Sequence, residues 1–282
     1  MELLEKIIKE IKNLPTLPTI YATLSEAVDN PATSTDKLAK IISSDQASAF
    51  KILKVANSPF YGFRGKIDTI SQAVLYLGFT EVKNIVFALS IINVFSKDRI
   101  LQDLRPVDLW AHSIGVGIIT RYIGQELGVK KLENYFLSGI LHDIGKIAFL
   151  EFAHTEYSHV LDIVNSKKIS IGEAETEIFG ADHAYLGQMI ATRWQLPKSI
   201  QDTIRYHNTG PVKDENAQLV ASVHIANIVA RILEFGYPGD NLIPKPNPKI
   251  WELIKITKDF FPSNRTEIED SFKNTVHTLL VE

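Results

Sequence analysis

The chain has 282 residues, 45% of them hydrophobic and 22% charged, which is the composition of a soluble globular protein with one large core or two ordinary ones. Its formal net charge is only -3, so no broad basic field concentrates a polyanion and no nucleic-acid partner is expected. The absence of cysteine excludes disulfides, thiol nucleophiles and thiolate metal sites. Any metal site must therefore use histidine, carboxylate, amide or water ligands.

The N-terminal segment "MELLEKIIKEIKNLP" predicts a charged amphipathic helix and lacks the basic start and apolar run of a signal peptide. The longest apolar stretches, such as "IVFALSIINVF", are shorter than the ~20 residues that span a bilayer. We therefore expect a cytoplasmic protein without a membrane partner.

Apolar residues recur at helical spacing almost throughout the chain, and no long stretch alternates like a half-buried strand. This pattern predicts an all-α fold, a bundle of many helices. Helix boundaries are expected at Pro15 and Pro18, at Gly78, and at the capping box formed by Ser170 and Glu173.

Two polar, proline-containing stretches divide the chain. "SKDRILQDLRP" separates two apolar helices and predicts a boundary near residue 100. "FGYPGDNLIPKPNP" predicts an irregular loop, more readily a connector than a lid, before the last helices. We expect a helical half over residues 1–100, a second half over 101–235, and a loop with C-terminal helices over 236–282.

All eight histidines follow residue 111, so any imidazole chemistry lies beyond that point. "SGILHDIGKIAF" places His142 and Asp143 side by side in an apolar segment. On a regular helix they point about 100° apart, near the cis angle of octahedral coordination, in which nitrogen and oxygen ligands bind Mn, Fe or Mg. Gly145 would let the helix end just beyond, and Lys146 would place a cation near an anionic group such as a phosphate.

Other polar residues on apolar helices extend this candidate site. Asp108 precedes His112 by four residues and shares its helix face, so the pair can hold a cation or the carboxylate can orient the ring. His183 and His207 stand near the ends of predicted helices, and Asn227 offers a weaker amide ligand.

An isolated histidine, however, is most often a surface residue or a hydrogen-bonded structural one. That interpretation fits His154, His159 and His277, which have no partner in the sequence. Burial against a carbonyl explains His224 as well as a site role does.

The ordered series resembles the HD superfamily of metal-dependent phosphohydrolases, and its members are His112, His142, Asp143, Lys146, His183, His207 and an amide at Asn227. "LHDIGK" and "FGADHAYLGQMIATRWQLPKSIQDTIRYHN" are most similar to the HDOD branch, the HD-related output domains of bacterial signalling proteins. In the first half, "NLPTLPTI" and "KLAKIISSDQASAFKILKVANSPFYGFRGKIDTISQAVLYLG" resemble the HDOD signature. The resemblance covers approximately Leu3 to Leu233 and implies an HD-superfamily-like bundle with an N-terminal helical subdomain.

The resemblance also implies roles for individual residues. The positions that match metal ligands of catalytic HD proteins, including the HD-GYP cyclic di-nucleotide phosphodiesterases, are His112, His142, Asp143, His183 and His207. Asp108 matches an additional acidic position and Lys146 a substrate-side lysine. The implied cofactor is a divalent transition metal, Fe or Mn ahead of Mg, Zn or Ni, and the implied ligand is a nucleotide or a phosphate.

Two departures from the HD pattern affect the expected function. Asn227 stands where HD enzymes supply their last aspartate ligand, and Asn208 replaces the second histidine of a common pair. Losing a carboxylate weakens divalent-metal binding and the activation of a bound water.

We therefore expect a regulatory or protein-interaction HDOD module of bacterial signal transduction, catalytically impaired but with a residual metal site. The alternative is a metal-dependent phosphohydrolase or phosphodiesterase acting on a nucleotide or cyclic di-nucleotide, in which Lys146 would be catalytic. A nucleotide sensor without turnover lies between these. The signalling partner and the oligomeric state are left open.

Overall fold

A computed structural model of the chain describes residues 2–12, 19–58, 60–63, 65–95, 100–210 and 215–280. These residues form sixteen helices and one isolated antiparallel bridge, between Leu101 and Leu104. The prediction of an all-α fold is confirmed. Residues 13–18, with the expected boundaries at Pro15 and Pro18, and residues 96–99 of the polar run lie outside the described residues.

The chain forms two compact units, and the first comprises residues 1–14 and 95–260. Its helices are α1 (Glu2–Lys12), α7 (Pro106–Glu126), α8 (Leu132–Leu141), α9 (Ile144–Phe152), α10 (His154–Lys167), α11 (Ile171–Phe179), α12 (His183–Arg193), α13 (Lys198–Tyr206), α14 (Ala217–Ile232) and α15 (Ile250–Leu253). The segment boundaries expected near residues 100 and 235 remain predictions.

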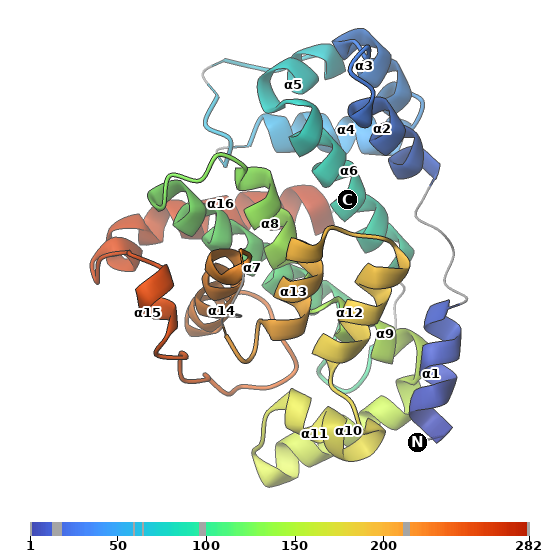
Figure 1. Cartoon of the computed structure of the whole chain (residues 1–282), viewed down its shortest axis with the longest axis vertical. Helices are drawn as coiled ribbons and strands as arrows, with labels where there is room; N and C mark the ends of the chain where they lie inside the picture. Colours follow the sequence, from blue (N-terminus) through green and yellow to red (C-terminus); the bar gives the residue numbers. More distant parts are fainter. Residues whose placement is uncertain are drawn as a thin grey trace. The chain divides into compact units, whose positions relative to one another are not determined.

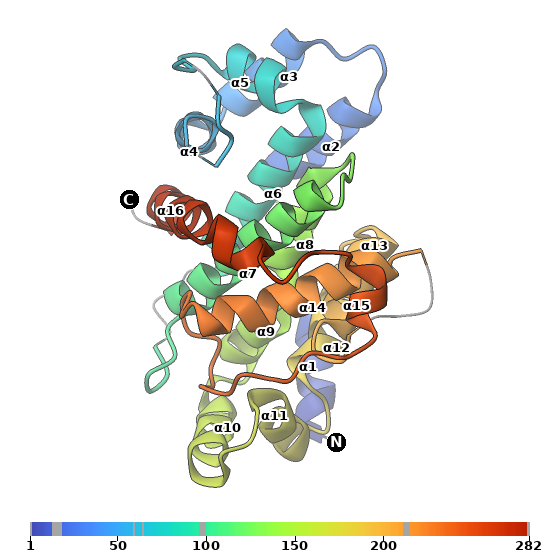
Figure 2. The same ribbon diagram turned by 90° about the vertical axis from the view of Figure 1, so that its left-hand side faces the viewer.

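Helix α7 is the central element of the first unit. It packs against α8 and α14, while α12 packs against α9 and α13, and α10 packs against α11 (Figure 1 and Figure 2). Most residues of α7 are buried on every face, as expected of a helix that is apolar all round. His112 on this helix therefore lies within the core.

Two glycine contacts bring the ends of α8 and α9 close to their neighbours. A Cβ on Gly139 would lie 2.4 Å from the Gly117 Cα, so α8 crosses α7 at this point with nearly touching backbones. A Cβ on Gly145 would lie 1.9 Å from the His183 carbonyl oxygen, so α9 and α12 meet equally closely. The two crossings hold the turn between α8 and α9 next to both α7 and α12.

That turn places His142 and Asp143 at a helix terminus, as the sequence predicts. Helix α8 ends at Leu141, and α9 begins at Ile144, so the pair lies in the break between the two helices. Gly145 is needed for the close approach of His183, not for ending a helix.

The second unit comprises residues 15–94 and 261–282. Its helices are α2 (Thr19–Asp29), α3 (Thr35–Ser43), α4 (Gln46–Ala56), α5 (Ile70–Leu77), α6 (Phe79–Phe95) and α16 (Phe260–Leu280). Helix α3 packs against α2, α4 and α5. The Asn57 amide exchanges hydrogen bonds with the Ile67 backbone at 2.7 and 2.8 Å, which fixes the loop between α4 and α5. Among the described residues no single helix is long and apolar enough to cross a membrane, and only the bent pair α5 and α6 passes that test together.

Candidate metal site

Asp143 lies at the centre of a buried histidine cluster in the first unit. Its carboxylate belongs to two groups of potential metal ligands, one with His112 and His142 and the other with His183 and His207. Within each group the ligand atoms lie within 4.8 Å of one another. We call the first the inner group and the second the outer triad.

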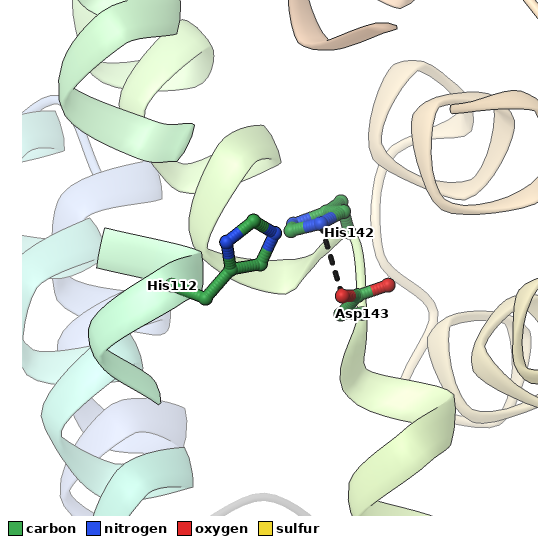
Figure 3. Close-up of side chains that lie close together, drawn as sticks. All are labelled: His112, His142 and Asp143. Atoms are coloured by element: carbon green, nitrogen blue, oxygen red, sulfur yellow. Dashed lines mark ion pairs between the residues drawn. The ribbon is translucent and has the colours of Figure 1, made fainter. Parts of the chain in front are cut away.

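The inner group lies where α7 meets the end of α8. The rings of His112 and His142 lie next to each other, with centroids 5.5 Å apart and planes tilted by 59°. The Asp143 carboxylate lies beside His142, with 3.2 Å between Nε2 and Oδ2 (Figure 3). Asn227 on α14 brings its amide to 2.9 Å from the His112 Nε2. Both histidines are fully buried, and Asn227 is 3% exposed. The inner group is thus enclosed by protein.

The outer triad has nearly equal edges. The His183 Nε2 and the His207 Nε2 each lie 3.3 Å from the Asp143 Oδ1 and 3.3 Å from each other. Neighbouring nitrogen and oxygen ligands of an ion with bonds of about 2.0–2.2 Å lie roughly 3.0–3.6 Å apart. The triangle therefore has the dimensions of one face of a coordination sphere.

The second ring nitrogen of each histidine fixes its orientation. The Nδ1 atoms of His112, His142 and His207 lie 3.1, 2.7 and 2.8 Å from the backbone carbonyls of Phe235, Gly139 and Ile204, and that of His183 lies 2.5 Å from a Glu175 carboxylate oxygen. For His142, His183 and His207 these acceptors require Nδ1–H as the donor, which leaves the lone pair on Nε2. The His112 Nε2 lies 2.9 Å from the Asn227 Oδ1, which is also an acceptor. Three Nε2 lone pairs therefore point towards Asp143, as in histidine metal sites.

Electrostatics favours the neutral form of His112 and His207 and the ionised form of Asp143. Burial lowers the pKa of His207 to about 3, and burial, followed by the nearby His142, lowers the pKa of His112 well below its ordinary value. Burial raises the pKa of Asp143, but His142 and Lys146 outweigh it and hold that pKa well below its usual range. At neutral pH His112 and His207 are therefore neutral and Asp143 is ionised.

The donor set fits a divalent ion. Among the described residues, the buried His142 Nε2 and Asp143 Oδ1 have no hydrogen-bond partner. Converging acceptors without a hydrogen between them repel one another, and a cation or a proton relieves that repulsion. Imidazole nitrogens with a carboxylate are ligands for Fe, Mn, Zn or Ni.

Lys146 and Asp108 are placed differently from the roles considered for them. The Lys146 ammonium is 1% exposed and donates to the Asp143 Oδ2 at 2.7 Å, so it is not presented to solvent. The Asp108 carboxylate accepts two hydrogen bonds from the Arg105 guanidinium, at 2.5 and 2.7 Å. Asp108 is not part of either ligand group, because Arg105, the residue just before α7, binds its half-buried carboxylate.

Glu175 is a site residue that the sequence did not reveal. One of its oxygens accepts from the His183 backbone N–H and Nδ1–H at 2.7 and 2.5 Å, and the other accepts from the Tyr157 hydroxyl at 2.6 Å. The residue is fully buried on the same face of α11 as Ile171 and Phe179. The sequence signal that could have identified Glu175 is a carboxylate on the apolar face of a helix. In the structure Glu175 orients the His183 ring.

His224 has both ring nitrogens satisfied by backbone. Its Nδ1 lies 2.7 Å from the His207 carbonyl, and its Nε2 accepts from the Asn247 N–H at 3.0 Å. Those contacts account for its burial without a metal.

A cavity of about 450 Å³ adjoins the outer triad. Its walls include the first turn of α11, His183, Asn208 and the ion pair of Arg231 with Asp240, whose Nη1 and Oδ1 are 2.6 Å apart. The Asn208 amide lies 3.0 Å from the His183 Nε2, between the triad and the cavity. The cavity therefore meets the cluster at His183, on the side of the outer triad.

Fold and site together define an all-helical protein with a buried histidine–aspartate cluster. The HDOD domain profile matches residues 14–209, and the chain belongs to the HDOD domain family.

Several proteins are similar to this chain. A solved HDOD domain protein of unknown function from Geobacter sulfurreducens is 27% identical, with a TM-score of 0.83 over 99% of this chain and 98% of that one. A solved protein from Shewanella amazonensis SB2B, named as a proposed phosphohydrolase, is 21% identical with a TM-score of 0.75, over 97% of this chain and 98% of that one. At that identity the likeness shows the fold alone.

The curated relative is an uncharacterized protein of Treponema pallidum (strain Nichols), 25% identical over 245 residues. The match covers 86% of this chain and 47% of that protein, so the chain spans about half the length of the curated relative.

Proposed function

We propose that the protein is a regulatory or protein-interaction module of bacterial signal transduction, which binds a divalent transition metal and does not turn over a phosphodiester. The metal is Fe or Mn ahead of Mg, because the ligand atoms beside Asp143 are imidazole nitrogens and Mg prefers oxygen ligands. The resemblance to the HD superfamily places Fe and Mn ahead of Zn and Ni. The signalling partner is another protein.

The observation that carries this proposal is the state of the carboxylates at the cluster. Asp143 is the only carboxylate in either ligand group of the described residues, and its Oδ2 is engaged by Lys146. Asn227 contributes an uncharged amide at the inner group, which cannot take up a proton. A bound divalent ion would supply Lewis acidity and lower the pKa of a coordinated water, but a neutral amide at position 227 gives the released proton no acceptor there.

A phosphohydrolase is the second candidate, favoured by the cavity beside the outer triad. A cavity next to a metal site is where a nucleotide or cyclic di-nucleotide would bind. The walls supply Asn208, Arg231 and the first turn of α11 as polar contacts. This arrangement supports ligand binding equally in a sensor that does not turn over its ligand.

The test is a metal analysis paired with an activity assay. The protein is purified without added metal, its bound metals are measured, and cyclic di-nucleotides and generic phosphodiesters are assayed with Mn²⁺ or Fe²⁺ supplied. We expect bound metal and no turnover above the level of Asp143→Ala. Turnover that Asp143→Ala abolishes would contradict the regulatory proposal and support the hydrolase.

A further inference from the structure

We propose that the cluster binds one metal ion, in the outer triad of Asp143, His183 and His207, and that Lys146 and Asn227 keep the inner group free of metal. The inference rests on the proposed function in that both require the cluster to bind a metal. It goes further by assigning different roles to two groups that contain the same residue types.

The two oxygens of Asp143 are not equivalent. Oδ2 faces His142 in the inner group and accepts a hydrogen bond from the Lys146 ammonium at 2.7 Å, so a cation is already present on that side. Oδ1 faces His183 and His207 at 3.3 Å and has no hydrogen-bond partner among the described residues. The oxygen that is available to an ion is the one in the outer triad.

Charge counting leads to the same assignment. The inner group would hold an ion with imidazoles, an amide and an oxygen that Lys146 has already neutralised. A second dication beside that buried ammonium would add like charges within a few ångströms, which a low-dielectric interior penalises strongly. The outer triad shares Asp143 and also has Glu175 bound to the far nitrogen of His183. Two carboxylates and one ammonium leave one net negative charge, which partly offsets a single dication and leaves a second dication without any compensation.

Access also differs between the two sides. All the histidines of both groups are buried, but His183 of the outer triad and the neighbouring Asn208 line the cavity of about 450 Å³, whose walls include neither His112 nor His142. The Asn208 amide lies 3.0 Å from the His183 Nε2. The two ends of an amide differ little in shape, so a half-turn about its last bond exchanges the N–H₂ for the carbonyl oxygen. Asn208 can donate to His183 without metal and present an oxygen towards the ion when one is bound.

The experiment compares His207→Gln with His112→Gln, using Mn²⁺ and Co²⁺ as probes on protein stripped with a chelator. The two histidines are a matched pair, because each is fully buried and each has its Nδ1 at hydrogen-bond distance from a backbone carbonyl. Equilibrium dialysis with elemental analysis gives stoichiometry and affinity, and the visible spectrum of bound Co²⁺ reports its ligands. We expect one ion in the parent chain, affinity weakened by more than about a hundredfold in His207→Gln, and affinity within about threefold of the parent in His112→Gln.

The reverse pattern, two ions in the parent chain, or no binding of either metal would overturn the inference. If His207→Gln does not fold, Asn208→Asp replaces it, because this change lies at the exposed edge of the triad. We expect at least about tenfold tighter binding of the single ion from the added carboxylate, and unchanged affinity would contradict the assignment. Phosphodiester turnover by a one-ion protein would overturn the proposed regulatory function and leave the position of the ion intact.

Discussion

The inner group and the outer triad share Asp143 but differ in their surroundings. The inner group has a lysine on its carboxylate oxygen, a neutral amide as its fourth member and two fully buried histidines. The outer triad has an unpartnered carboxylate oxygen, a histidine oriented by Glu175 and a cavity beside it. The comparison shows that ligand residue types alone do not define a metal site, because neighbouring charges and access decide which group an ion occupies.

Replacing the shared residue, Asp143→Asn, has the largest expected effect. It removes the carboxylate from both groups and leaves the buried Lys146 without its partner. We expect loss of metal binding and a fall of about 3–5 kcal/mol in the free energy of unfolding of the metal-free protein, which is typical of breaking a buried ion pair. Metal analysis and chemical denaturation measure both. Asp270→Asn on the exposed part of α16 is the control. An equal loss of metal binding and of unfolding free energy in Asp270→Asn would contradict the role assigned to Asp143.

Glu175→Gln tests the outer triad alone. Glutamine keeps the size of the side chain but weakens the hold on the His183 Nδ1–H, so we expect metal affinity to fall by about 10- to 100-fold. Glu177→Gln, two residues further along α11 and half-exposed in an ion pair with Lys167, is the matched control. Equal affinities in the two variants would show that Glu175 is structural only.

Asn227→Asp tests the inner group alone. The new carboxylate would face His112, where the amide now lies at 2.9 Å, and would offset the Lys146 charge. We expect a second, weaker ion, with the affinity of the first changed by less than about threefold. Titration with Mn²⁺ followed by elemental analysis gives the number of bound ions. If Asn227→Asp still binds one ion, but with higher affinity, the original ion lies in the inner group.

Asp240→Asn has the smallest expected effect and concerns the cavity wall. Burial raises the pKa of Asp240, but Arg231 outweighs it and the pKa lies below its ordinary value. A carboxyl whose pKa is lower in the folded state stabilises the fold above the unfolded value of ~4, and that stability is lost as the pH falls through the folded value. We expect Asp240→Asn to be about 2 kcal/mol less stable at pH 7, with the difference shrinking below pH 4. A difference that is constant with pH would contradict the ion-pair explanation.

The sequence predicted the helical fold because helical apolar spacing runs through the described helices, as in α1, where Ile7 and Ile11 are buried. It also indicated the residues that the structure brings together, His112, His142, Asp143, His183 and His207, although their binding of a metal stays a prediction. The partner of Asp108 could not be deduced from the spacing to His112, since Arg105 three residues earlier competes for the same carboxylate. The contact of Lys146 with Asp143 and that of Glu175 with His183 depend on side-chain rotamers and tertiary packing, which helical periodicity does not encode.

The most direct test of a single ion in the outer triad is anomalous scattering from crystals soaked with Mn²⁺ or Fe²⁺. One peak between the Asp143 Oδ1, the His183 Nε2 and the His207 Nε2, with none beside His112, is the predicted result. A peak between His112 and His142, alone or together with the first, would contradict it.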